Sequence, residues 1–139
     1  MALEGGKDRW ERRCEVKVLT FQPRFADMVA RGEKCQTIRR ARIVPILPTD
    51  TVSLRMWTGA PYRSKQRVLG SGMVFEVAPV VIDELHSKID GERIRDRNRF
   101  AQRDGFRDWD ELLVWFRETH GLPFHGTLIR WLLLTGGVK

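Results

Sequence analysis

The sequence predicts an α+β fold, in which a small sheet or barrel of mixed strands carries short flanking helices. Two observations support this fold class. Segments in which polar and apolar residues alternate outnumber those with helical periodicity, and glycine, proline and capping residues keep each helical segment short. The length of 139 residues is that of one domain, and a chain of this size can bury one hydrophobic core without metal or disulfide staples.

The first residues are expected to stand apart from the domain. Residues 1–13 combine a Gly-Gly pair with a run of charged residues and have little to bury, which predicts a flexible N-terminal arm. The domain itself is predicted to span residues 14–135, followed by a C-terminal tail at 136–139. Its first strand is expected over 15–19, where polar and apolar residues alternate.

The next element is predicted to be a short helix over residues 25–31. From Phe25 onward its apolar residues recur at the i, i+3 and i+4 positions, which places them on one helix face. Gly32 follows at the position where a left-handed glycine usually ends a helix. We expect residues 34–40 to continue from there as a second extended segment.

Two further strands are predicted in the middle of the chain. Pro45 and Pro48 exclude a central strand and place a loop there. Residues 52–57 alternate between polar and apolar and are expected to form a strand that ends at the break over 58–61. Residues 70–81 are expected to form a long strand.

The last third of the chain is predicted to hold one helix and one strand. Residues 83–102 are irregular and charge-dense, and their pattern assigns neither a helix nor a strand. Asp108 and Glu111 have the spacing of a capping box and begin an amphipathic helix that ends before Gly121. Residues 127–134 are rich in β-branched and large apolar residues, which predicts a closing strand that is buried on most of both faces.

The composition excludes several classes of protein. Hydrophobic residues make up 42% of the chain, which excludes disorder over most of it. No apolar run approaches the roughly 18 residues that a membrane span needs, and the charged N-terminus lacks the apolar stretch of a signal peptide. Cys14 and Cys35 are too few for a disulfide framework. We therefore expect free thiols and a cytoplasmic location, with no membrane partner.

The charge of the chain favours an anionic partner. Lysine and arginine number 25 against 18 acidic residues, which gives a formal net charge of +7. Such an excess favours nucleic acid, although many small basic proteins bind none specifically. The sequence has no Cys-x-x-Cys, His-Glu-x-x-His, P-loop or dinucleotide pattern, so neither a cofactor nor a bound metal is expected. A carboxylate-held Mg²⁺ or Mn²⁺ for nuclease chemistry stays open.

The residues after the first helix are the strongest functional signal. If residues 37–39 are extended, Thr37 and Arg39 point to one side, and Lys34 in the preceding turn can reach the same side. An ammonium, a hydroxyl and a guanidinium around one cleft can bind an anion or activate a nucleophile. They can equally form an ordinary polar face at the start of a strand, with Arg39 paired to Asp104.

These residues also carry a family resemblance. Gly32, Lys34, Thr37 and Arg39 complete a Gly-x-Lys-x-x-Thr-x-Arg pattern after the first helix. The pattern resembles the hallmark of the ASCH domain, a relative of the PUA RNA-binding fold. Over residues 104–106, Asp-Gly-Phe resembles the acidic-Gly-Phe segment of the family, which usually has Glu in place of this Asp.

A third, weaker element of the resemblance lies further along the chain. Trp57-Thr58-Gly59 with Arg63-Ser64-Lys65 is similar to a strand end and basic loop of phage and bacterial members. The whole resemblance covers residues 15–134. It implies a PUA-like small β-barrel of mixed strands with short flanking helices and a central cleft.

The resemblance also implies activities. Bacterial relatives include a 4-acetylcytidine amidohydrolase, in which the motif lysine, the motif threonine and the acidic residue are assigned to catalysis. At the matching positions this chain has Lys34, Thr37 and Asp104. Another relative is a ribonuclease, and others are presumed to bind RNA without turnover. The expected partner is accordingly RNA or a modified nucleoside, and all three functions remain open.

The amidohydrolase chemistry makes demands on each of these residues. Thr37 needs a base to become a nucleophile, and Lys34 can serve only if its pKa falls from about 10.4 toward 7–8. Burial and the charge of Arg39 both lower that pKa, whereas a touching Asp104 would hold the lysine charged. Asp104 would pass a proton to the leaving amine, but it is shorter than glutamate, and about 1 Å of misplacement can cost roughly 100-fold in rate.

Two basic clusters are predicted to flank the cleft and to track phosphates, with aromatic residues nearby for stacking on bases. The alternatives are a solvated charged loop and a tryptophan that belongs to the core. The clusters and the two aromatic residues are Arg39, Arg40 and Arg42, then Arg63, Lys65 and Arg67, with Trp57 and Tyr62.

Overall fold

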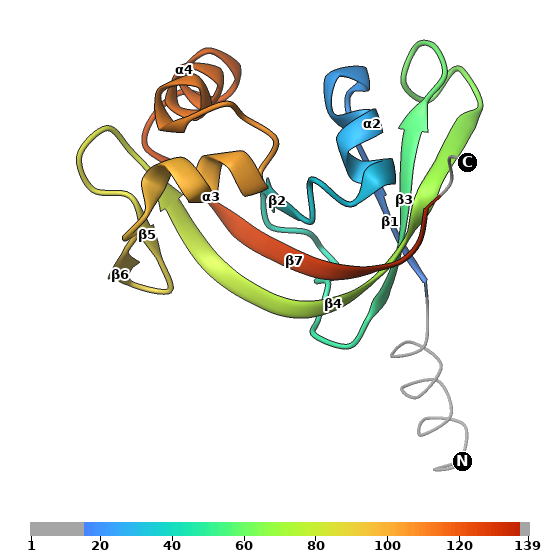
Figure 1. Cartoon of the computed structure of the whole chain (residues 1–139), viewed down its shortest axis with the longest axis horizontal. Helices are drawn as coiled ribbons and strands as arrows, with labels where there is room; N and C mark the ends of the chain where they lie inside the picture. Colours follow the sequence, from blue (N-terminus) through green and yellow to red (C-terminus); the bar gives the residue numbers. More distant parts are fainter. Residues whose placement is uncertain (1–15, 137–139) are drawn as a thin grey trace.

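The computed structural model describes residues 16–136, so the predicted arm at 1–13 and the end of the tail at 137–139 lie outside the described residues. Within the described residues, seven strands and three helices follow one another (Figure 1). In order they are β1 (Lys17–Thr20), α2 (Pro23–Arg31), β2 (Gln36–Arg39), β3 (Thr51–Trp57), β4 (Gln66–Ile82), β5 (Lys88–Ile89), β6 (Glu92–Arg93), α3 (Arg97–Arg103), α4 (Trp109–Thr119) and β7 (Phe124–Gly136). The predicted α+β class is confirmed.

A long, curved antiparallel pair, β4 and β7, forms the centre of the sheet (Figure 1). On one side β4 pairs antiparallel with β3, which pairs in parallel with β1. Further along, β4 also pairs with β5 of the small β5–β6 hairpin, and β7 pairs antiparallel with β2. Register shifts near Gly72 and between Val74 and Glu76 bend the pair, because bulges increase strand twist.

The predicted closed barrel is not confirmed, because the sheet stays open between β1 and β2. Within residues 16–136 no backbone ladder joins these two strands. Two arginine side chains bridge part of the gap instead. Arg39 Nη2 donates to the Thr20 carbonyl at 2.6 Å, and Arg42 Nη1 donates to the Val18 carbonyl at 3.3 Å.

Helix α2 follows the sequence prediction closely. Pro23 occupies its first turn, where the missing N–H costs no hydrogen bond. Gly32 caps its end with φ 79°, and the N–H groups of Glu33 and Lys34 both donate to the Met28 carbonyl. This tight ending turns the chain back across the helix end and directs Lys34 into the interior.

Residues 83–102, whose sequence pattern assigns no element, form regular structure. The segment holds β5, β6 and most of α3. The Asp96 side chain caps α3 by accepting a hydrogen bond from the Arg99 N–H at 3.0 Å, and Phe100 with Ala101 supplies its buried face. An arginine-rich helix with so narrow an apolar face gives almost no periodic signal in the sequence.

Helix α4 begins at the predicted cap. The Asp108 carboxylate accepts a hydrogen bond from the Glu111 N–H at 2.9 Å. The Glu111 carboxylate reaches back one residue further than a capping box requires, to the Arg107 N–H at 3.0 Å. The buried face of α4, with Leu112 and Phe116, packs against α3 and against Phe124 at the start of β7.

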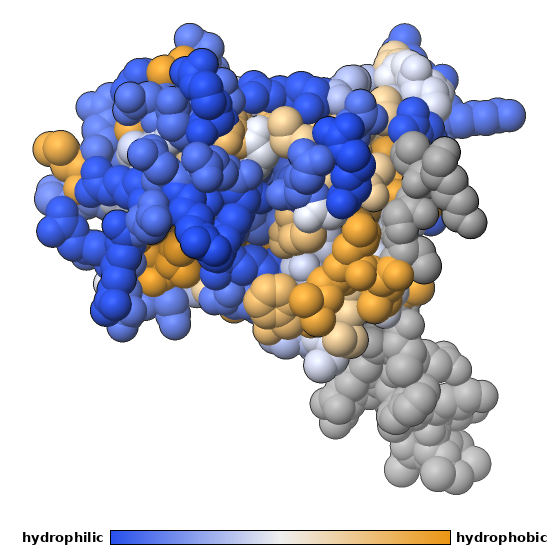
Figure 2. Space-filling view, in the orientation of Figure 1, coloured by the Kyte–Doolittle hydropathy of each residue, from blue (hydrophilic) through white to orange (hydrophobic). Residues whose placement is uncertain are grey.

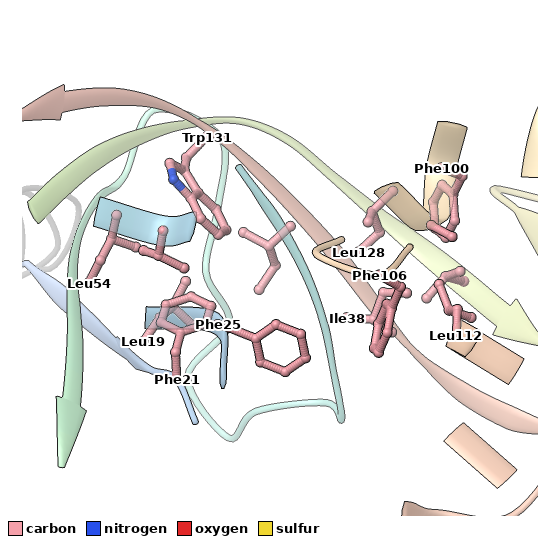
Figure 3. Close-up of a cluster of buried hydrophobic side chains, with 14 of the residues drawn as sticks. Leu19, Phe21, Phe25, Ile38, Leu54, Phe100, Phe106, Leu112, Leu128 and Trp131 are labelled. Atoms are coloured by element: carbon pink, nitrogen blue, oxygen red, sulfur yellow. The ribbon is translucent and has the colours of Figure 1, made fainter. Parts of the chain in front are cut away.

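The core lies between the sheet and the helices (Figure 3). In Figure 3, Leu19, Leu54 and Trp131 gather near β1 and β3, while Leu128 and Leu112 gather where α3 and α4 cover β7. No helix in the described part of the chain is long and apolar enough to cross a membrane.

Candidate functional site

A cavity of about 240 Å³ lies among α2, β2, the turn after α3, and α4. Nearly half of its lining residues are aromatic, and its polar groups come from β1, from β2 and the residues flanking it, and from the ends of α3 and α4. The aromatic residues are Phe21, Phe25, Phe106, Trp115, Phe116, His120 and Phe124. The charged and hydroxyl-bearing residues are Thr20, Lys34, Thr37, Arg39, Arg40, Asp104 and Thr119. The three proposed catalytic residues thus meet at one hollow.

Lys34 is buried, with 2% of its surface exposed. Its Nζ donates to the Gln36 carbonyl at 2.8 Å and to the Asp104 carbonyl at 2.6 Å, and lies 4.9 Å from the centre of the Phe25 ring. Gly105 makes room for the Lys34 side chain. It has a φ of 95°, and a Cβ at this position would meet the Phe25 ring at 2.9 Å and Lys34 Cδ at 3.1 Å. The glycine of the Asp-Gly-Phe segment therefore shapes the site.

Burial lowers the pKa of Lys34 from 10.5 to about 8; the Asp104 carboxylate raises it, and the Arg39 charge lowers it again. A neutral amine has two N–H groups and one lone pair. The two carbonyls that Lys34 contacts satisfy those two N–H groups, so the neutral form can keep both hydrogen bonds and still present a lone pair as a base.

Asp104 ends α3 and is 4% exposed. Its Oδ2 lies 3.6 Å from Lys34 Nζ, and its Oδ1 accepts a hydrogen bond from Gln36 Nε2 at 3.2 Å. Burial raises the pKa of Asp104, while Lys34 and the Gln36 hydrogen bond lower it. Burial therefore favours the neutral form of both Lys34 and Asp104.

Gln36 joins this pair to Arg130 on β7, and it was not among the residues predicted for the site. Its side chain is 1% exposed, and its Oε1 accepts a hydrogen bond from Arg130 Nε at 3.1 Å. Arg130 is the cross-strand neighbour of Gln36 on β7 and forms an ion pair with Glu76 at 2.7 Å. A glutamine between Cys35 and Thr37 gives no sequence signal, because its partners lie far away in the chain.

Thr37 and Arg39 lie on the same side of β2, as the alternation of a strand requires. Arg39 Nε donates to Thr37 Oγ1 at 2.9 Å, and its guanidinium lies 4.9 Å from the centre of the Phe21 ring. Burial lowers the pKa of Arg39 to about 10, opposed by Asp104. Thr37 is 5% exposed, and no hydrogen bond joins it to Lys34 within residues 16–136.

Of the predicted basic residues, only Arg39 and Arg40 line the cavity. Arg40 lies at 5.2 Å over the Phe124 ring. Arg42 is exposed and holds a carbonyl of β1. The remaining three, Arg63, Lys65 and Arg67, are exposed on the β3–β4 hairpin and do not line the cavity.

The predicted aromatic pair lies on the same hairpin. Trp57 is half-buried at the end of β3, and its ring centre lies 5.1 Å from that of Tyr62, which is 88% exposed. Neither ring lines the cavity. A role for the hairpin residues in binding nucleic acid stays a prediction.

His120 is a second residue that the sequence did not assign to the site. It lies at the end of α4 with its ring centre 4.7 Å from that of Phe124, and burial followed by the charge of Arg40 lowers its pKa. No cluster of three or more histidine, cysteine or acidic residues that could hold a metal ion occurs between residues 16 and 136.

Comparisons with known proteins give structural matches alone. No family model and no curated protein sequence matches the chain. The crystal structure of ASCH from Zymomonas mobilis matches with a TM-score of 0.55 and 16% identity, covering 90% of this chain and 71% of that one. A serine-to-alanine mutant of the same protein matches with a TM-score of 0.53 and 17% identity, covering 89% and 72%. This chain therefore has the ASCH fold that its Gly-x-Lys-x-x-Thr-x-Arg pattern predicted.

Proposed function

We propose that the cavity binds the base of an acylated cytidine and hydrolyses its amide bond. The observation that carries the proposal is a buried lysine whose pKa is lowered to about 8, in the same cavity as a threonine hydroxyl and a second buried titratable group, Asp104. Buried groups with strongly shifted pKa values are typical of catalytic sites. The aromatic wall suits a flat base, which stacks on such side chains.

The first step forms a tetrahedral adduct on Thr37, which becomes an ester when the C–N bond breaks in the second step. Neutral Lys34 takes the proton of the Thr37 hydroxyl, whose oxygen attacks the carbonyl carbon of the acyl group. The hydrogen bond from Arg39 Nε to Thr37 Oγ1 stabilises the developing alkoxide. We place this proton transfer in the substrate complex, because catalytic hydrogen bonds are often longer before the substrate binds.

The second step releases the base. The C–N bond breaks, and the exocyclic nitrogen takes a proton from neutral Asp104. Protonated Lys34 then gives a proton back to the Asp104 carboxylate. Water then attacks the Thr37 ester with Lys34 again as the base, and the proton returns to the threonine oxygen as the carboxylic acid leaves. The products are cytidine and a carboxylic acid, and the enzyme regains its starting protonation state.

One observation favours a second candidate, an RNA-binding module without turnover. The Asp104 carboxylate lies 3.6 Å from Lys34 Nζ and raises its pKa. If this ion pair keeps Lys34 charged, the lysine is an anchor for the end of α3 and not a base. The aromatic wall would then hold a base of RNA without any reaction.

Incubation of the purified protein with N4-acetylcytidine, followed by chromatography, separates the two candidates. Hydrolysis predicts cytidine and acetate, with a rate at least about 100-fold lower for Lys34→Met and for Thr37→Val, since a general base contributes on the order of 100-fold or more. The matched control is Thr119→Val, which removes a hydroxyl at the cavity wall that has no assigned role. Absence of product would refute the enzyme proposal, and cleavage of mixed RNA would instead support a ribonuclease.

A further inference from the structure

A second hollow, of about 430 Å³, lies between α3 and the β5–β6 hairpin. In Figure 2 hydrophilic residues dominate the surface over these elements. The hollow is lined by more arginines than any other described cavity, and these are Arg93, Arg95, Arg99, Arg103 and Arg130. Four carboxylates also line it, namely Glu76, Asp90, Glu92 and Asp96.

The local structure directs four of these arginines into one space. Arg99 and Arg103 are four residues apart on α3, so they share a helix face, and the buried Phe100 between them also lines the hollow. Arg93 ends β6 and Arg95 lies in the bend that follows, and both line the hollow from the side of the hairpin. Two pairs of guanidiniums therefore face the hollow from two different elements.

In the described residues the guanidinium groups of these four arginines share the hollow with four carboxylates but form no direct ion pair with any of them. Arg130, in contrast, is bound to Glu76. The Asp96 carboxylate is already engaged as the cap of α3. Like charges four residues apart destabilise a helix slightly, and a bound anion would relieve this repulsion between Arg99 and Arg103.

We propose that this hollow binds the phosphodiester backbone of an RNA strand, one base of which occupies the aromatic cavity on the other side of α3. The inference rests on the proposed function, and it makes a polymer, not a free nucleoside, the substrate. Guanidinium groups bind phosphate oxygens through paired hydrogen bonds. Their distribution over two elements around an open hollow suits successive phosphates of a strand better than one enclosed phosphate.

The continuity of the two hollows supports the same ligand. Arg103 lines the arginine hollow and the next residue, Asp104, lines the aromatic cavity. The Gln36 side chain links the two hollows, since its amide contacts Asp104 of the aromatic cavity and Arg130 of the arginine hollow. A strand that crosses the end of α3 would therefore contact both sites with adjacent nucleotides.

The test is the binding of a short, unstructured, fluorescein-labelled RNA, measured by anisotropy over a range of salt concentrations. For single-stranded RNA, log K falls linearly with log salt concentration, and each phosphate contact that is removed reduces the magnitude of this slope by about 0.7. Arg99→Gln with Arg103→Gln should lower the slope by about 1.4 and weaken binding about 25-fold at about 0.1 M salt. Arg93→Gln with Arg95→Gln on the opposite wall should do the same.

The control pair is Arg31→Gln with Arg117→Gln, which removes the same net charge from exposed arginines that are paired with Glu33 and Glu84. It should change binding by no more than about twofold, because long-range effects of exposed charges are screened. Circular dichroism of every variant verifies the fold.

Several results would overturn the proposal. Equal losses in the control and hollow pairs would show that net charge alone matters. A loss confined to Arg63→Gln with Arg67→Gln would assign the phosphates to the β3–β4 hairpin. Binding of inorganic phosphate without binding of RNA would assign a single-phosphate site.

The same assay keeps this proposal separate from the proposed function, because anisotropy reports binding without any reaction. Arginine-dependent RNA binding without hydrolysis of N4-acetylcytidine refutes the hydrolase and leaves the RNA site standing. Hydrolysis together with RNA binding that the arginine substitutions in the hollow do not weaken refutes the RNA site and supports the hydrolase.

Discussion

Replacing Lys34 by methionine should remove a rise in stability that the wild-type protein shows at alkaline pH. The pKa of Lys34 is 10.5 in an exposed chain and about 8 in the folded protein. Below pH 8 both states hold the proton, and the folded protein bears the full cost of burying the charge. Between about pH 8 and 10.5 the folded protein releases a proton that the unfolded chain keeps, so the free energy of unfolding increases with pH.

The magnitude follows from the same two pKa values. At about 1.4 kcal/mol per pKa unit, the drop corresponds to about 3 kcal/mol, of which about 2.5 kcal/mol is recovered between pH 7 and 10. Methionine keeps the length and apolar stem of the lysine but does not titrate. Lys34→Met also leaves the Gln36 and Asp104 carbonyls without their donor, which lowers stability at every pH value. The cost of burying the lysine charge is therefore measured from the pH dependence of stability and not from stability at one pH value.

Urea unfolding followed by tryptophan fluorescence at several pH values from 7 to 10 measures this difference. Every other titrating group is common to both proteins, so the difference between the two curves reports Lys34 together with its effect on the pKa values of Cys35 and Asp104. We expect the wild-type curve to rise by about 2–3 kcal/mol relative to the Lys34→Met curve. Parallel curves would refute the conclusion that burial holds this amine close to neutrality.

Three further outcomes are expected. The value of kcat/KM for N4-acetylcytidine should rise with pH up to about pH 8, because Lys34 must be neutral to act as a base, and a flat acid limb in a pH–rate profile would contradict that role. Gln36→Leu should lower the free energy of unfolding by about 1–3 kcal/mol, since it leaves buried polar atoms of Asp104 and Arg130 unpaired; urea unfolding with no loss of stability would contradict the network. Gly105→Ala should destabilise the fold by about 1–3 kcal/mol because of its positive φ and the crowding of its Cβ, and calorimetry that shows no lowering of Tm would contradict the assigned packing.

The N-terminal part of the site was predictable because its geometry is local. Gly32 ends α2 in a left-handed conformation, and strand alternation places Thr37 and Arg39 on one side. Both features depend only on residues within a few positions of one another. The approach of Asp104 could not be derived in that way and came from the family resemblance.

Other features of the site depend on contacts that the sequence pattern does not encode. Gln36 acquires its role from Asp104 and Arg130, which lie 68 and 94 residues further along the chain. The charge count could not distinguish Arg39 and Arg42, which hold carbonyls of β1, from arginines that remain available to a ligand. Helix α3 was missed because its short apolar face lies within an arginine-rich segment.

The most direct test of the central claim is to look for the acyl group on Thr37. Stoichiometric protein is mixed with N4-acetylcytidine, quenched with acid at short times and digested, and the peptides are analysed by mass spectrometry. The proposed mechanism predicts an acetyl group on Thr37 that appears before the reaction is complete and then disappears as acetate accumulates. Acetate release at the wild-type rate by Thr37→Ala, or an acetyl group carried by a different residue of the cavity, would contradict it.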